Sequence, residues 1–173
     1  MQHNNNNGLQ QSTFVIESAI LKDMFSSDPN IREDCDKLVA YVAFYNKKLF
    51  VTHSVYQKIE NQLQGESVLN YINAVISDGG EITGAAGFPT ENEDILFLIG
   101  NLTLSGYKEI KVIRKGTDIE ADKKTLEKSN VLKELQKLGL MKFGFQTTKI
   151  ADLMAAIRVT DNEFNDYVSN QYL

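Results

Sequence analysis

The stretch from Thr90 to Asp118 constrains the fold more than any other part of the chain, because it carries signals for a helix, a turn, a strand and an acidic loop in succession. Thr90 followed three residues later by Glu93 is typical of a helix start, where the hydroxyl accepts an unpaired backbone N–H. Apolar residues then recur at helical spacing as far as Leu102, and a glycine follows that can end the helix. The next run, 110–113, is rich in β-branched residues and predicts a short buried strand.

Two earlier segments, 12–18 and 49–52, carry continuous apolar runs, which are typical of strands covered on both faces. Segments with helical periodicity separate the three runs. Such alternation predicts an α/β fold, a three-layer sandwich with a central, mostly parallel sheet of four or five strands and helices on both faces. The predicted core residues of these strands are Phe14, Val15, Ile16, Leu49, Phe50, Val51, Val112 and Ile113.

Capping residues and periodicity predict the boundaries of the remaining elements. Helix starts are predicted at Asp28-Pro29, Ser54, Thr90, Thr148 and Asp161. Residues 68–76 predict the clearest amphipathic helix, closed by Gly79-Gly80. Residues 81–88 predict a short edge strand, and 141–145 predict a last strand.

The composition is that of one ordinary globular domain. With 173 residues, of which 42% are hydrophobic, the chain can build a substantial core. We expect a flexible polar tail over 1–11 and a single domain over 12–173. The net charge of −5 argues against a broadly basic nucleic-acid coat. One cysteine, no apolar run of the ~18 residues that a membrane helix needs and no recognisable signal peptide predict a cytoplasmic protein without a membrane partner.

Four carboxylates fall at related places in this predicted layout. Glu17 ends the first strand, Glu60 lies on the helix after the second, Asp94 opens a later helix and Asp118 follows the next strand. The carboxyl ends of parallel strands share one edge of the sheet, where ligands bind in open α/β folds. Carboxylates that converge there repel one another, so a hard cation such as Mg²⁺ or Mn²⁺ is their natural partner. Each acid also has a plainer interpretation as a solvated surface residue.

The motifs around these acids resemble the PIN-domain family of metal-dependent ribonucleases, which includes the nucleases of toxin–antitoxin pairs. The matching segments are FVIES with Glu17, LFVTHSVYQKIE with Ser54 and Glu60, NEDILFLIG with Asp94, and IKVIRKGTD with Thr117 and Asp118. The resemblance covers roughly residues 13–157. It implies a PIN-like fold and hydrolysis of a phosphodiester.

The resemblance also implies roles for individual residues. Glu17, Glu60, Asp94 and Asp118 would be catalytic and would bind Mg²⁺ or Mn²⁺, with Ser54 and Thr117 as hydrogen-bonding partners of these ligands. Arg114, Lys115, Lys123 and Lys124 would contact the phosphates of single-stranded RNA, with DNA as an open alternative. An inhibitory protein partner and a homodimer are also left open.

Two other functions are compatible with the same sequence. The first is a catalytically inactive PIN-like module that acts in protein–protein interaction, with its acids on the surface and its lysine-rich segment a solvated helix laced with ion pairs. The second is a nucleotide- or phosphate-binding domain. The GAAG segment lacks the lysine and the strand-to-helix placement of a phosphate-binding loop, which disfavours this second alternative.

Overall fold

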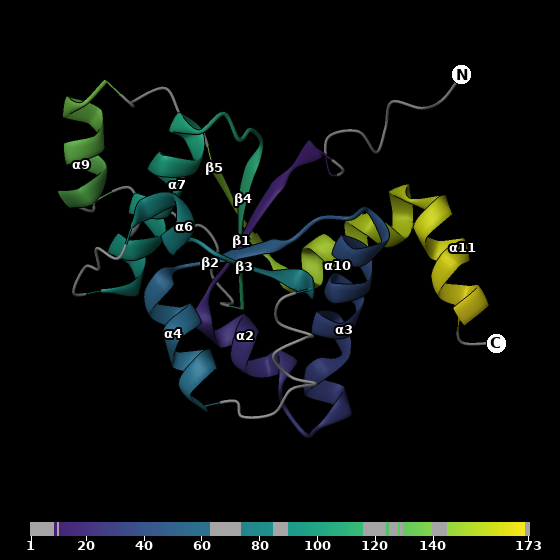
Figure 1. The fold of residues 1–173 in the computed structure, drawn as a ribbon. Helices are drawn as coiled ribbons and strands as arrows, with labels where there is room; N and C mark the ends of the chain where they lie inside the picture. The colour runs from purple at the N-terminus through teal and green to yellow at the C-terminus, as the bar shows by residue number, and fades with distance from the viewer. Residues whose placement is uncertain are drawn as a thin grey trace, which may run out of the picture.

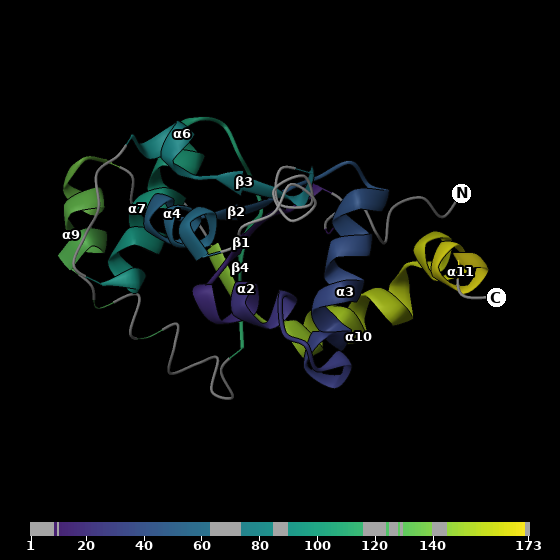
Figure 2. The same cartoon turned by 60° about the horizontal axis from the view of Figure 1, so that its bottom comes forward.

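The computed structural model describes residues 11–62, 74–84, 90–115, 130–139 and 145–171, together with residues 9, 124 and 128. Five parallel strands form one sheet in the order β3-β2-β1-β4-β5. The strands are β1 (Thr13–Ile16), β2 (Leu49–Val51), β3 (Ile76–Asp78), β4 (Ile110–Arg114) and β5 (Phe145–Lys149). Helices lie on both faces of this sheet (Figures 1 and 2), which confirms the predicted three-layer α/β sandwich.

The helices divide into two groups by the face that they cover (Figure 1). One face is covered by α2 (Ser18–Met24), α3 (Pro29–Phe44), α4 (His53–Gln62) and α10 (Ile150–Thr160), with α11 (Asn162–Gln171) packed against α3. The other face is covered by α7 (Glu91–Leu104), which contacts the short helix α6 (Gly80–Thr83) and α9 (Asn130–Lys137). None of the helices in the described part of the chain has both the length and the apolar character of a membrane span.

The central strand β1 sends its side chains alternately into two hydrophobic clusters. Phe14 and Ile16 pack with the α2, α3 and α10 group, whereas Val15 packs with α7 and with Val112 of β4. All eight predicted core residues are buried, and the most exposed of them, Phe50, is only 8% accessible. The prediction of strands covered on both faces is therefore confirmed.

Helix α7 begins where its capping residue predicts. The Thr90 hydroxyl accepts the N–H of Glu93 at 3.2 Å and donates to the Glu93 carboxylate at 3.0 Å. The predicted caps at Asp28 and Asp161 are confirmed in the same way, since each carboxylate accepts a backbone N–H of the first turn that follows.

We expect Thr90→Ala to lower the free energy of unfolding by about 0.5–2 kcal/mol, because it leaves an amide of the first turn without its partner. Urea denaturation measures the change. Thr103→Ala on the same helix is the control, because that hydroxyl bonds to the Ile99 carbonyl inside the helix. A loss for Thr90→Ala no larger than that of the control would contradict the capping role.

Two predicted helix starts are wrong. Helix α4 starts at His53, so Thr52 is the capping residue in place of Ser54: its hydroxyl accepts the N–H of Val55 and its carbonyl accepts the N–H of Tyr56. The reason is that β2 ends at Val51 and the chain turns into the helix at once. Helix α10 likewise follows β5 directly, with Lys149 at its start where Thr148 was predicted.

The region after α4 also differs from the prediction. Residues 76–78, predicted to continue a helix, form the edge strand β3, which pairs with β2 in the register Leu49↔Ile76. Pairing with β2 supplies the backbone hydrogen bonds that local periodicity does not reveal. Residues 81–83 of the predicted edge strand belong to the helix α6 (Gly80–Thr83). Residues 68–73 of the predicted helix, 85–88 of the predicted edge strand and 141–144 of the predicted last strand lie outside the described residues.

Candidate functional site

Polar side chains follow the strands at the carboxyl edge of the sheet. Glu17 comes directly after β1, Thr52 comes after β2, Asp78 ends β3 and Arg114 ends β4. The strand order reverses between β1 and β4, because the chain passes from β1 to β2 and β3 on one side and returns to β4 on the other. Ligands of open α/β sheets bind in the crevice at such a reversal.

A largely buried ion pair lies at this reversal. The carboxylate of Glu17 is 3.3 Å from Nη2 of Arg114, and the two side chains are 13% and 11% exposed. Its other oxygen accepts the backbone N–H of Lys115 at 2.7 Å. Nη2 of Arg114 also donates to Asn92 on α7 at 3.1 Å. The predicted catalytic Glu17 and the predicted phosphate contact Arg114 are therefore held against each other by three elements.

The first residue of α7 is anchored beside this pair. One oxygen of Glu91 accepts the N–H of Ser18 at 2.6 Å, and the other accepts the Ser18 hydroxyl at 2.8 Å. This double contact joins the starts of α2 and α7 and so fixes the helix that carries Asp94. The motif analysis did not single out either residue, and two chain positions so far apart give no local signal of the contact.

Two of the predicted site residues, Asp94 and Ser54, lie near each other. They line one small cavity between the end of β2 and the first turns of α7, and its other lining residues are Thr52, His53, Thr83, Phe97 and Leu98. The cavity volume is about 10 Å³, close to the space that one water molecule needs. Carboxylate, hydroxyl and imidazole groups therefore surround a site of the size of one water at the carboxyl edge.

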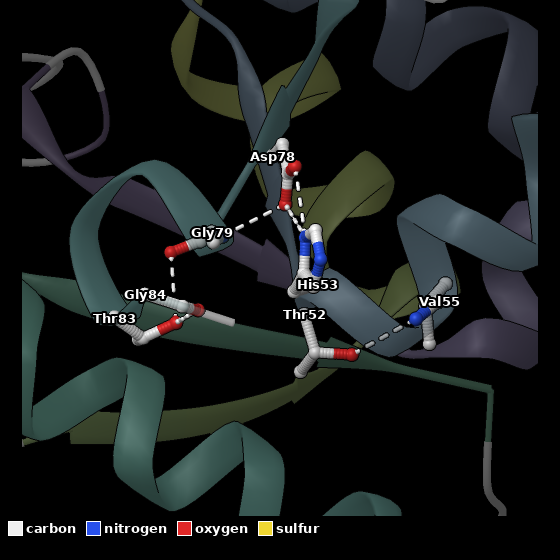
Figure 3. Close-up of polar contacts among 8 residues, drawn as sticks. Thr52, His53, Val55, Asp78, Gly79, Thr83 and Gly84 are labelled. Atoms are coloured by element: carbon white, nitrogen blue, oxygen red, sulfur yellow. Dashed lines mark hydrogen bonds and ion pairs between the residues drawn. The ribbon is translucent and has the colours of Figure 1, made fainter. Parts of the chain in front are cut away.

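A histidine–aspartate pair lies at the same edge and was not predicted. Nδ1 of His53 is 3.0 and 3.2 Å from the two oxygens of Asp78, as Figure 3 shows. One of these oxygens also accepts the N–H of Gly80 at 2.7 Å. A Cβ at Gly80 would lie only 2.4 Å from Nδ1, so this close approach requires glycine. The sequence offered two signals for this pair. His53 comes directly after a predicted strand, and two glycines come directly after Asp78.

Glu60 does not line the cavity that Ser54 and Asp94 share. It is exposed on α4, where it accepts a hydrogen bond from Tyr56. The pKa of the Tyr56 hydroxyl is raised above its usual range, first by burial and then by the carboxylates Glu60, Asp78 and Glu81. In the described parts of the chain, no three His, Cys, Asp or Glu side chains lie close enough together to hold one metal ion.

The remaining predicted site residues are placed as follows. Lys115 is exposed at the end of β4, and its ammonium group lies 3.0 Å from a carboxylate oxygen of Asp23. Lys124 is exposed and helical. Thr117, Asp118 and Lys123 lie outside the described residues, so their roles stay predictions.

Fold and site together define an α/β protein with a parallel five-stranded sheet whose carboxyl edge carries acids, a histidine and a buried arginine. Comparison of the chain with protein-family models, with curated proteins and with solved structures found no match.

Proposed function

We propose that the protein is a metal-dependent, PIN-like endoribonuclease that hydrolyses phosphodiester bonds in single-stranded RNA. The observation that carries this proposal is the position of Glu17 and Asp94. Both stand at the carboxyl edge of a parallel sheet, one directly after the central strand and the other in a helix that packs over the same edge. A substrate in the crevice at the strand reversal would meet both carboxylates.

The oxygen donors of this edge fit Mg²⁺ or Mn²⁺. Mg²⁺ keeps several waters and usually takes only one or two protein carboxylates together with substrate phosphates, so a group of three protein acids is not required. A carboxylate has about four lone-pair sites. The two contacts of Glu17, to Arg114 and to the Lys115 amide, therefore leave it able to bind a cation.

Each residue has a definite part in the proposed reaction. Glu17 and Asp94 would hold the cation, with Glu60 and Asp118 as the further predicted ligands. The bound cation would supply Lewis-acid activation of water and of the scissile phosphate. The remaining predicted residues would orient the ligands and bind the substrate backbone: Ser54 and Thr117 beside the carboxylates, and Arg114, Lys115, Lys123 and Lys124 against the phosphates.

A cleavage assay tests the proposal. Purified protein is expected to cut a labelled single-stranded RNA in the presence of Mg²⁺ or Mn²⁺. Cleavage should stop when the cation is chelated and should decrease steeply as the salt concentration rises. Lys115→Ala should reduce the salt dependence of binding by about one unit of slope. Lys137→Ala is the matched control, because that lysine is 73% exposed on α9 and pairs with Glu134. Cleavage that survives chelation, or no cleavage with either cation, would refute a metal-dependent nuclease.

The second candidate function is a catalytically inactive PIN-like module that binds another protein. The ion pair between Glu17 and Arg114 favours it, because the guanidinium already supplies the positive charge that a cation would bring to Glu17. Calorimetric titration with Mn²⁺ separates the two candidates, since the inactive module predicts no heat of binding. An inhibitory partner of the toxin–antitoxin kind and a homodimer are proposals that gel filtration and co-purification test.

We also propose a cytoplasmic location. Cys35 is a buried free thiol, and its pKa is raised to about 12, mainly by burial. A thiol in this state is unreactive toward disulfide exchange and supports neither nucleophilic catalysis nor a disulfide framework.

A further inference from the structure

The pair formed by His53 and Asp78 fixes the imidazole more firmly than its loop position suggests. His53 is the first residue of α4, directly after the capping Thr52. One oxygen of Asp78 accepts the N–H of Gly80. Nδ1 of His53 lies within 3.2 Å of both Asp78 oxygens. The backbone at Gly80 lies close against the ring, because a Cβ at this position would be only 2.4 Å from Nδ1 of His53. The imidazole is therefore clamped between two strand ends and a turn.

This arrangement determines which ring nitrogen carries the proton in neutral His53. An ionised carboxylate accepts hydrogen bonds and cannot donate them, so Nδ1 beside Asp78 must be the N–H. Nε2 is then the nitrogen with a free lone pair, on the side of the ring away from Asp78 (Figure 3). His53 also lines the cavity that Ser54 and Asp94 share. A residue with a basic ring nitrogen therefore lines this cavity, which has about the size of one water molecule.

We infer that His53 is a catalytic residue of this edge, the acceptor of the proton that the attacking water loses, and that Asp78 is its positioning residue. The inference rests on the proposed function. The Nε2 lone pair takes a proton from the water, and the oxygen left behind forms the new bond to phosphorus. The bond from phosphorus to the leaving ribose oxygen breaks, and its electron pair stays on that oxygen, which takes a proton from solvent. His53 then returns its proton to solvent.

Four of the five titratable groups on the elements packed around His53 are carboxylates. The titratable groups on the neighbouring elements are Asp78 on β3, Asp94 on α7 and Glu81 on α6, with Tyr56 and Glu60 on α4 itself. A histidine that shares its proton with a carboxylate in this way is a common general base.

The tautomer can be tested without any activity measurement. The chain has only two histidines, His3 and His53, so imidazole ¹⁵N–¹H correlation spectra of wild type and of His3→Gln assign both rings. We expect neutral His53 to carry its proton on Nδ1, whereas free histidine prefers Nε2. Asp78→Asn should abolish that preference. A neutral His53 protonated on Nε2 in the wild type would overturn the inference.

Kinetics then test the catalytic role. We expect His53→Gln to lower kcat for RNA cleavage by about 100-fold or more and to remove the rise in rate across the pH range where histidines titrate. Asp78→Asn should lower kcat less, and His3→Gln should leave it unchanged. Circular dichroism and Mn²⁺ affinity equal to wild type show that the variants are folded.

The outcomes separate this inference from the proposed function. A wild type that cleaves RNA, together with a His53→Gln variant of equal rate and pH profile, overturns the role of His53 alone. If His53→Gln does not fold, the rate and pH profile of Asp78→Asn decide in the same way. A wild type that cleaves nothing overturns both.

Discussion

Replacing Asp94 by asparagine is expected to lower the affinity for Mn²⁺ by more than about 100-fold and to abolish RNA cleavage. The substitution keeps the size and shape of the side chain but removes the negative charge that a hard cation requires. Calorimetric titration of wild type and variant measures the change directly. Unaltered Mn²⁺ binding by the variant would exclude Asp94 as a ligand.

The direction of the change in stability of the same variant is a second, independent test. Glu91, Glu93 and Asp94 all lie in the first turn of α7, so removing one charge relieves repulsion among like charges. We expect the metal-free Asp94→Asn variant to be as stable as wild type or more stable. Asp152→Asn is the control, because Asp152 is the single acid in the first turn of α10. There only the favourable interaction with the helix dipole is lost, at about 0.3–1 kcal/mol.

Truncating Ile16 to alanine is expected to lower the free energy of unfolding by about 2–4 kcal/mol. Ile16 lies in the central strand, is 1% exposed and faces the cluster that α2, α3 and α10 complete. The substitution removes three carbons from a packed interior and leaves a cavity that the rigid sheet cannot close. Urea denaturation, fitted with a common slope, measures the loss.

The control for this truncation is a second isoleucine that differs in its exposure. Ile31→Ala on α3 makes the same chemical change at a side chain that is 47% exposed, and we expect a change within about 0.5 kcal/mol. Equal losses for the two variants would mean that the effect comes from the intrinsic preferences of alanine rather than from burial in the core.

The central sheet could be predicted because its strands carry a strong local signal. Strands β1, β2 and β4 are covered on both faces, so each appears in the sequence as a short run of mostly apolar residues. The cap at Thr90 was predictable for a similar reason, since all the contacts that define it lie within four residues. The motif around Ser54 and Asp94 also led to two residues that share one cavity.

The rest depended on contacts between distant parts of the chain. Residues 76–78 become a strand only because β2 lies beside them, and their own pattern continues the preceding helical spacing. The pairing of His53 with Asp78 spans a separation of 25 residues and is closed by a turn at Gly80. Arg114 was predicted to contact phosphates from its charge alone, whereas its placement against Glu17 follows from the neighbouring positions of β1 and β4.

The position of β1 at the centre of an all-parallel sheet has a consequence for how the chain folds. Parallel neighbours cannot be joined by a hairpin, so every pairing closes a long loop. Phe14 of β1 meets Leu49 of β2 after roughly 35 residues, but Thr13 meets Ile110 of β4 only after roughly a hundred. During synthesis, one edge of the central strand therefore stays unpaired until more than half of the chain has been made. Unpaired strand edges recruit other chains, so the open edge of β1 exposes the growing chain to misassembly during this interval.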